Sequence, residues 1–143
     1  MAGADQYNLE RFVAAQEPVY ARVVGELRAG RKRSHWMWFV FPQIAGLGMS
    51  AVSQQYAIGS RDEARAYLAH AVLGRRLREC AQLVVDVEGR RVEEIFGYPD
   101  DLKFRSSMTL FARATQDNAV FQAALGKYFG GAEDERTVEL LGE

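Results

Sequence analysis

The sequence has a single cysteine, Cys80, in 143 residues. One cysteine excludes a disulfide within the chain, and this scarcity is typical of a reducing compartment, so we expect a cytoplasmic protein. No apolar run approaches the roughly 18 residues of a membrane-spanning helix, and the start of the chain does not resemble a signal peptide. We therefore expect no membrane association, a flexible N-terminus at residues 1–4 and a single helical domain over residues 5–143.

An excess of one charge is also missing. Lys and Arg total 18 and Asp and Glu total 19, for a net charge of −1. This balance argues against nucleic acid as a partner, and nothing in the composition indicates a protein partner. The one basic run is Arg31-Lys32-Arg33. It is more typical of a solvated helix end than of a phosphate-binding site, because cations stabilise the C-terminal end of a helix.

Residues that bind metals or act as nucleophiles are few. The two histidines, His35 and His70, and Cys80 are scattered, so the sequence predicts no metal site and no cofactor. Cys80 lies in a stripe of core residues, which argues against a nucleophile. His70 follows an apolar stripe, and a structural role is favoured there.

The sequence shows no convincing pair of strands, whereas apolar residues recur at helical spacing through most of the chain. It predicts an all-α, compact single domain of about seven to nine helices, several of them short, with no substantial sheet. Asn8 is predicted to cap the first helix. Pro18 is predicted to kink that helix or to divide it into two nearly collinear helices. Residues 60–86 are predicted to form two helices that meet near His70.

The aromatic segment, Ser34–Ser50, is the most unusual part of the chain. Its first residues form a short helix or a buried extended stretch. Gly46, Gly48 and Ser50 then form a Gly-x-Gly-x-Ser loop, which could direct N–H groups at an anion. The alternative is a tight turn into a short helix capped by Ser50, since the loop lacks the GK[ST] of a P-loop.

Lys103, Ser106 and Ser107 have a spacing that places all three on one helical face. They could hold a phosphate or polarise an oxygen. The alternative is a serine bonded to its own helix and a lysine that extends into solvent.

The aromatic segment also contains His35, Trp36 and Trp38. His35 could transfer a proton or could be a core histidine. Two indole N–H groups so close together are difficult to satisfy in a core, which favours a pocket wall. Asp101 is a candidate catalytic carboxylate near Lys103.

Several strings of residues cover nearly the whole chain in order: Leu9-Glu10-Arg11-Phe12, Ser34-His35-Trp36-Met37-Trp38, Phe41-Pro42-Gln43, Gly46-Leu47-Gly48 and Lys103-Phe104-Arg105-Ser106-Ser107-Met108-Thr109-Leu110-Phe111. Together they resemble the bacterial and fungal family named domain of unknown function 1810 (DUF1810). One departure is Ala71, where that family often has proline. The resemblance implies a mainly helical single domain and no particular reaction. A looser similarity to NADAR-type ADP-ribose glycosidases transfers no residue and implies only a nucleotide-derived ligand.

Our first hypothesis is a domain that binds or processes a small phosphorylated, nucleotide-like ligand of the ADP-ribose type. Whether it is an enzyme stays open, with His35, Asp101 and Lys103 as catalytic candidates. The candidate ligand-binding residues are Trp36, Trp38, Gln43, Gly46, Gly48, Ser50, Ser53, Tyr56, Lys103, Ser106 and Ser107. The second hypothesis is a non-catalytic module that binds protein or nucleic acid through Arg31-Lys32-Arg33 and exposed aromatics. A third is that these residues only hold a helical core together.

Overall fold

A computed structural model describes residues 5–142, and the expectations for residues 1–4 lie outside that range. The predicted all-α class is confirmed, since the described residues form no strand beyond one isolated bridge. The helices are α1 (Glu10–Gln16), α2 (Tyr20–Arg28), α3 (Met37–Val40), α4 (Ala51–Gln55), α5 (Arg61–Ala69), α6 (Leu73–Val85), α7 (Val92–Phe96), α8 (Asp100–Ala114), α9 (Ala119–Phe129) and α10 (Glu135–Leu140).

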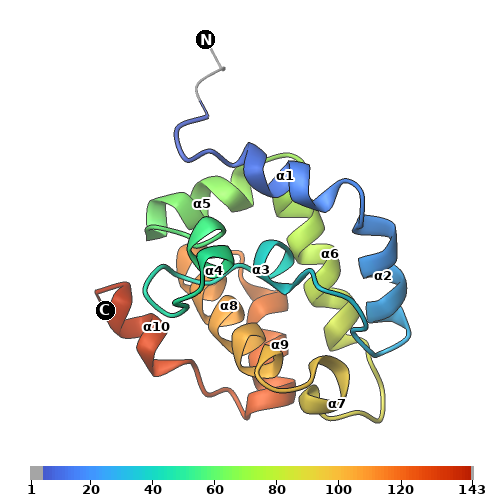
Figure 1. Cartoon of the computed structure of the whole chain (residues 1–143). Coiled ribbons are helices and arrows are strands. Elements are labelled where there is room, and N and C mark those ends of the chain that lie inside the picture. Colours follow the sequence, from blue (N-terminus) through green and yellow to red (C-terminus); the bar gives the residue numbers. More distant parts are fainter. Residues whose placement is uncertain (1–4, 143) are drawn as a thin grey trace.

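The first two helices differ from the prediction. Figure 1 shows that α1 and α2 run in clearly different directions, so they are not collinear. The chain turns at Glu17–Val19, where Pro18 has no N–H to continue a helical ladder. Asn8 does not cap α1 either. Its φ is positive at 52°, and the carboxylate of Asp5 accepts the N–H groups of Leu9 and Glu10 instead.

Most of the other helix ends follow the local sequence. Ser50 and Ser60 cap α4 and α5 with their hydroxyl oxygens, as Ser does at a helix start. Gly97 and Gly130 end α7 and α9 with positive φ angles of 75° and 62°, which glycine adopts without a steric penalty. Helices α5 and α6 meet at His70, as predicted.

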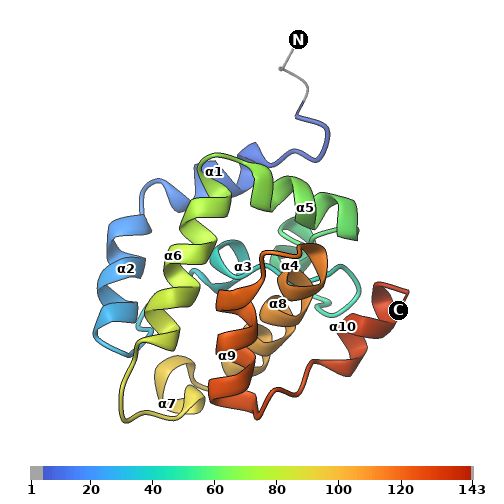
Figure 2. The same ribbon diagram turned by 180° about the vertical axis from the view of Figure 1, so that it is seen from behind.

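Helix α8 occupies the middle of the molecule. It packs against α5, α7, α9 and α10, and almost every side chain from Phe104 to Ala112 is buried. Figures 1 and 2 show α3 and α4 on one side of α8 and α9 on the other. The aromatic segment therefore lies directly over the central helix.

Aromatic side chains join that segment to α8. The rings of Phe41 and Phe104 meet edge to face with centroids 5.0 Å apart, and Phe96 of α7 stacks on Phe104 at 4.9 Å. Burial of a phenylalanine side chain stabilises a fold by about 1.5–3 kcal/mol, so this cluster is a main anchor of the segment.

Within residues 5–142, none of the helices combines the length and the apolar character needed to cross a membrane.

Candidate functional site

The two motifs singled out in the sequence line one pocket of about 240 Å³. Gln43, Leu47 and Gly48 of the aromatic segment form one wall with Ser53 of α4. The other wall comes from Pro99, Leu102, Lys103 and Ser106, at the start of α8. Residues about fifty positions apart in the chain are thus brought together at one end of the central helix.

The first wall is held in place by main-chain bonds. Ile44 and Ile58 form an isolated parallel bridge, in which Ala45 donates to the Ile58 carbonyl at 2.8 Å and Ile58 donates to the Gln43 carbonyl at 2.8 Å. Both isoleucines are buried. This bridge closes residues 44–58 into a loop that carries Gly48 and Ser53.

Arg11 of α1 fixes the end of that loop. Its guanidinium donates to the carbonyls of Gln55 and Ala57 at 2.8 and 2.9 Å and forms an ion pair with Glu63 of α5 at 2.9 Å. Glu63 also accepts the N–H of Gly59 at 2.9 Å. Arg11 therefore acts on the pocket only as a positioning residue.

The Gly-x-Gly-x-Ser loop packs tightly. A Cβ on Gly48 would lie 2.4 Å from the Cβ of Ser53, so only glycine fits there. Gly46 has a φ of +105° and approaches Leu140 of α10. Ser50 accepts the N–H of Ser53 at 3.1 Å and donates to the Ser53 hydroxyl at 2.9 Å. The arrangement matches a tight turn into a capped helix, and Ser53, rather than Ser50, lines the pocket.

Lys103 is the one cation that lines this pocket. Its ammonium lies 3.4 Å from a carboxylate oxygen of Asp100 and 5.2 Å from the ring centre of Trp38. Lys32 contacts the other oxygen of Asp100 at 2.9 Å. Because Asp100 is shared between two lysines, its charge does not fully compensate Lys103.

The neighbouring polar residues of α8 differ in exposure. Ser106 lines the pocket and donates to the Leu102 carbonyl one turn earlier at 3.1 Å. Ser107 is fully buried, and its hydroxyl has no hydrogen-bond partner. Asp101 is also buried, with one carboxylate oxygen unpartnered. Neither Ser107 nor Asp101 is among the residues that line the pocket.

The two tryptophans have different roles. Trp36 is 1% exposed, and its indole donates to Glu26 of α2 at 2.9 Å. It is a core residue and does not face the pocket. Trp38 is half-buried beside Lys103. His35 is exposed and is not part of the pocket lining.

Glu26 is a residue that sequence reasoning missed. Its carboxylate accepts from the N–H groups of Arg33 and Ser34 at 2.7 and 3.1 Å, from the Ser34 hydroxyl at 2.6 Å and from the Trp36 indole. Burial by itself would raise the pKa of Glu26. The hydrogen bonds, led by that of the Ser34 hydroxyl, lower the pKa by more than burial raises it, so the net pKa is below the usual value. No local pattern in the sequence pairs a residue of α2 with this segment.

Tyr56 belongs to an aromatic cluster. Its ring lies 5.8 Å from Phe12 of α1 and 5.5 Å from Phe39 of α3, measured between centroids. This cluster packs α4 against α1 and α3. Tyr56 is only partly buried, but it does not line the pocket.

Exposed hydrophobic side chains occur close in sequence to residues that line the pocket. Large hydrophobic side chains are exposed at four of the described positions: Met49 (84%), Val52 (39%), Tyr98 (81%) and Leu102 (46%). Met49 and Val52 lie in the chain between Gly48 and Ser53, which line one wall. Tyr98 precedes Pro99 on the other wall, and Leu102 lines the pocket itself.

The remaining candidates are structural. The Nδ1 atom of His70 accepts the N–H groups of Val72 and Leu73 at 3.1 and 3.2 Å, at the start of α6. Cys80 is fully buried, and burial raises the pKa of its thiol to about 12. Within residues 5–142, no three His, Cys, Asp or Glu side chains are grouped as metal ligands.

Three comparisons with known proteins were made. A family model described as "Protein of unknown function (DUF1810)" matches residues 6–141. No curated protein matches the chain. A solved structure, that of the conserved hypothetical protein Rv1873 from Mycobacterium tuberculosis, is 63% identical, with a TM-score of 0.96. The alignment covers 97% of this chain and 99% of that one. The relative's description names neither ligand nor reaction.

Proposed function

Because the chain belongs to the DUF1810 family, whose description states no activity, we propose from its own pocket that it binds a small phosphorylated, nucleotide-like ligand. One observation carries this proposal. The aromatic segment and the start of α8 line the same pocket, with Lys103 and the exposed side chain of Leu102 in its wall.

Lys103 is the group we assign to the phosphate. An ammonium has three donors. Among the described residues, the charge partner of Lys103 is Asp100, which lies 3.4 Å away and is also bound by Lys32 at 2.9 Å. A phosphate could therefore contact Lys103 while Asp100 keeps its contact with Lys32. The hydroxyl of Ser53, which accepts from Ser50 and keeps its own hydrogen, lies in the same lining and can donate a further hydrogen bond.

The size of the pocket limits what it encloses. Its volume of about 240 Å³ is below the roughly 300–1,000 Å³ typical of sites that enclose a drug-sized ligand. We assign the pocket to a phosphate and an adjoining sugar. A base would then lie outside the pocket, against the exposed side chain of Leu102 or of Tyr98, the residue before Pro99.

No reaction is proposed. His35 and Asp101 do not line the pocket, and a general acid or base must lie within hydrogen-bonding reach of the group that it protonates or deprotonates. The proposal is therefore one of binding, with Lys103 as its central residue.

The second hypothesis, a basic and aromatic docking surface, has less support. It requires Arg31, Lys32 and Arg33 to face a partner, but the side chain of Lys32 is only 10% exposed and is paired with Asp100. A buried, paired lysine contributes little to the binding of a macromolecular anion.

The test is a thermal-shift and calorimetry screen against ribose 5-phosphate, AMP, ADP and ADP-ribose. A ligand at 100 times its Kd should stabilise the fold by about 2.7 kcal/mol. In the Lys103→Gln variant we expect at least a tenfold loss of affinity, because a charge-assisted hydrogen bond to phosphate is lost.

The matched control is Arg22→Gln, which removes one positive charge from the exposed face of α2. It should bind as the unmodified chain does. Equal affinity in the Lys103→Gln variant, or no stabilisation by any of the four compounds, would overturn the proposal.

A further inference from the structure

A larger depression of about 740 Å³ lies at the opposite end of α8. It is lined by Arg65, Leu68 and Ala69 of α5, by Arg78 of α6 and by residues 113–117. Lys103 and Ala114 are eleven positions apart on α8, which corresponds to about 16 Å along the helix axis. This depression is therefore separate from the pocket at Lys103.

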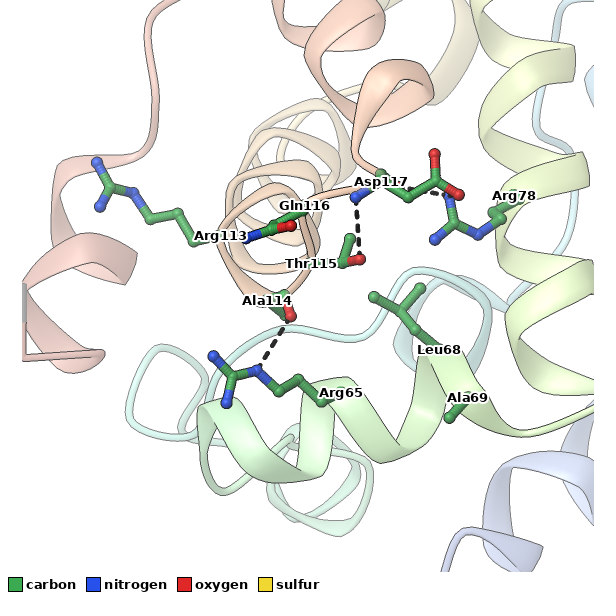
Figure 3. Close-up of a pocket in the computed structure, with 9 residues that line it drawn as sticks. All are labelled: Arg65, Leu68, Ala69, Arg78, Arg113, Ala114, Thr115, Gln116 and Asp117. Carbon is green, nitrogen blue, oxygen red and sulfur yellow. Dashed lines mark hydrogen bonds and ion pairs between the residues drawn. The ribbon is translucent and has the colours of Figure 1, made fainter.

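Figure 3 shows how its arginines are arranged. Arg65 and Arg78 approach the depression from α5 and α6, with Thr115 and Leu68 between them. Arg113 points away, toward α10, where it forms a two-pronged ion pair with Glu133 at 2.6 and 2.7 Å. Two of the three arginines in the lining thus face the cavity.

Contacts with the main chain position both guanidinium groups. The Nε atom of Arg65 donates to the carbonyl of Ala114 at 3.3 Å, and Nη1 of Arg78 donates to the carbonyl of Asp117 at 2.8 Å. The Nη2 atom of each arginine has no hydrogen bond to the described part of the chain. Arg78 is held through Nη1 alone and keeps the parallel N–H groups of Nε and Nη2 available for an oxyanion, whereas Arg65, held through Nε and Nη1, keeps Nη2.

The acidic groups nearby neutralise these charges only weakly. A carboxylate oxygen of Asp62 lies 3.6 Å from the guanidinium of Arg65, and one of Asp117 lies 3.8 Å from that of Arg78. The side chain of Asp62 is 75% exposed and that of Asp117 is 86% exposed. Exposed ion pairs of this length contribute little and exchange readily with other anions. The hydroxyl of Thr115 and the side chain of Gln116 supply further polar groups in the lining.

We propose that this depression is a second binding site, specific for a small molecule with a multiply charged oxyanion such as a diphosphate or a dicarboxylate. Arg65 and Arg78 bind the oxyanion from opposite sides, and Leu68 and Ala69 contact the apolar part of the molecule. The volume suits a ligand of ordinary metabolite size. This site is independent of the function proposed for the pocket at Lys103.

The experiment titrates pyrophosphate and succinate into the Lys103→Gln variant by calorimetry, so that the other pocket does not contribute. Saturable binding of either compound is expected, and the preferred one identifies the oxyanion. Arg65→Gln and Arg78→Gln should each weaken that binding at least tenfold. Arg78→Lys should also weaken it, because an ammonium cannot form the paired bonds of a guanidinium.

Arg75→Gln is the matched control, since it removes a positive charge from the exposed face of the same helix as Arg78. Its affinity should be unchanged. Melting temperatures of all variants establish that each one is folded. Absence of saturable binding by both compounds, or an equal loss in the Arg75→Gln variant, would overturn the proposal.

Discussion

At the scale of the single residue, Glu26 shows how one carboxylate positions the aromatic segment. Four donors from residues 33–36 converge on it. It is only partly buried, and it determines where the chain enters α3. Removal of such an acceptor leaves the indole of Trp36 without a partner in the core, which costs more than the loss of an exposed hydrogen bond.

We predict that Glu26→Gln lowers the free energy of unfolding by about 2 kcal/mol at pH 7, because an amide accepts fewer and weaker hydrogen bonds than a carboxylate. The pKa of Glu26 is lowered in the folded state. Its contribution is therefore complete above its ordinary pKa and is lost as the pH falls through the lower, folded value. Urea unfolding at neutral and acidic pH measures both effects.

The difference between the variant and the unmodified chain should shrink at acidic pH, where Glu26 itself becomes protonated. Glu88→Gln, at an exposed position whose side chain forms no hydrogen bond or ion pair with the described residues, is the control. It should change stability by less than about 0.5 kcal/mol. If Glu26→Gln behaves like Glu88→Gln at neutral pH, Glu26 does not position the segment.

At the scale of the element, the contact between α5 and α6 depends on a glycine. A Cβ on Gly74 would lie 2.0 Å from the carbonyl oxygen of Leu68. The chain therefore turns from α5 to α6 with the two backbones in direct contact, and His70 caps the second helix from within the turn. This packing also places Leu68 and Arg78 beside the same depression.

Gly74→Ala is predicted to destabilise the fold by about 3 kcal/mol or more, because a backbone carbonyl cannot move aside as a side chain can. Gly126→Ala in α9 is the opposite case. A Cβ there meets nothing within 4 Å, and replacement of a helical glycine by alanine stabilises a protein by about 0.5–1 kcal/mol. Guanidinium unfolding curves of the two variants should shift in opposite directions. A Gly74→Ala variant as stable as the unmodified chain would contradict the close contact between Gly74 and the Leu68 carbonyl.

At the scale of the whole molecule, Cys80 reports on global unfolding. Its thiol is fully buried in α6, and burial raises its pKa to about 12. The thiolate is the reactive form, and burial both disfavours it and keeps a reagent away from the sulfur. We predict that the folded protein resists Ellman's reagent and that reaction rises in parallel with loss of helical circular dichroism in urea. Fast labelling of the folded protein would show that α6 opens locally.

The tertiary structure also explains the strings that identify the family. Arg11 ties α1 to residues 55–57, Ser34 and Trp36 donate to Glu26, and Gly48 allows the approach of Ser53. These residues mainly support the loop and the segment around the pocket. The residues that face the pocket, such as Gln43, Ser53 and Lys103, are interspersed among them.

The sequence alone determined the helical class and most helix ends, because apolar spacing, serine caps and glycine ends are local properties. It did not show that α1 and α2 change direction, since packing decides that angle. It also could not separate Trp36 from Trp38. Trp36 lies just before α3 and Trp38 lies within it, so no helical spacing relates the directions of their side chains. Only the packed structure, with Glu26 beside one indole and Lys103 beside the other, decides which one faces the core.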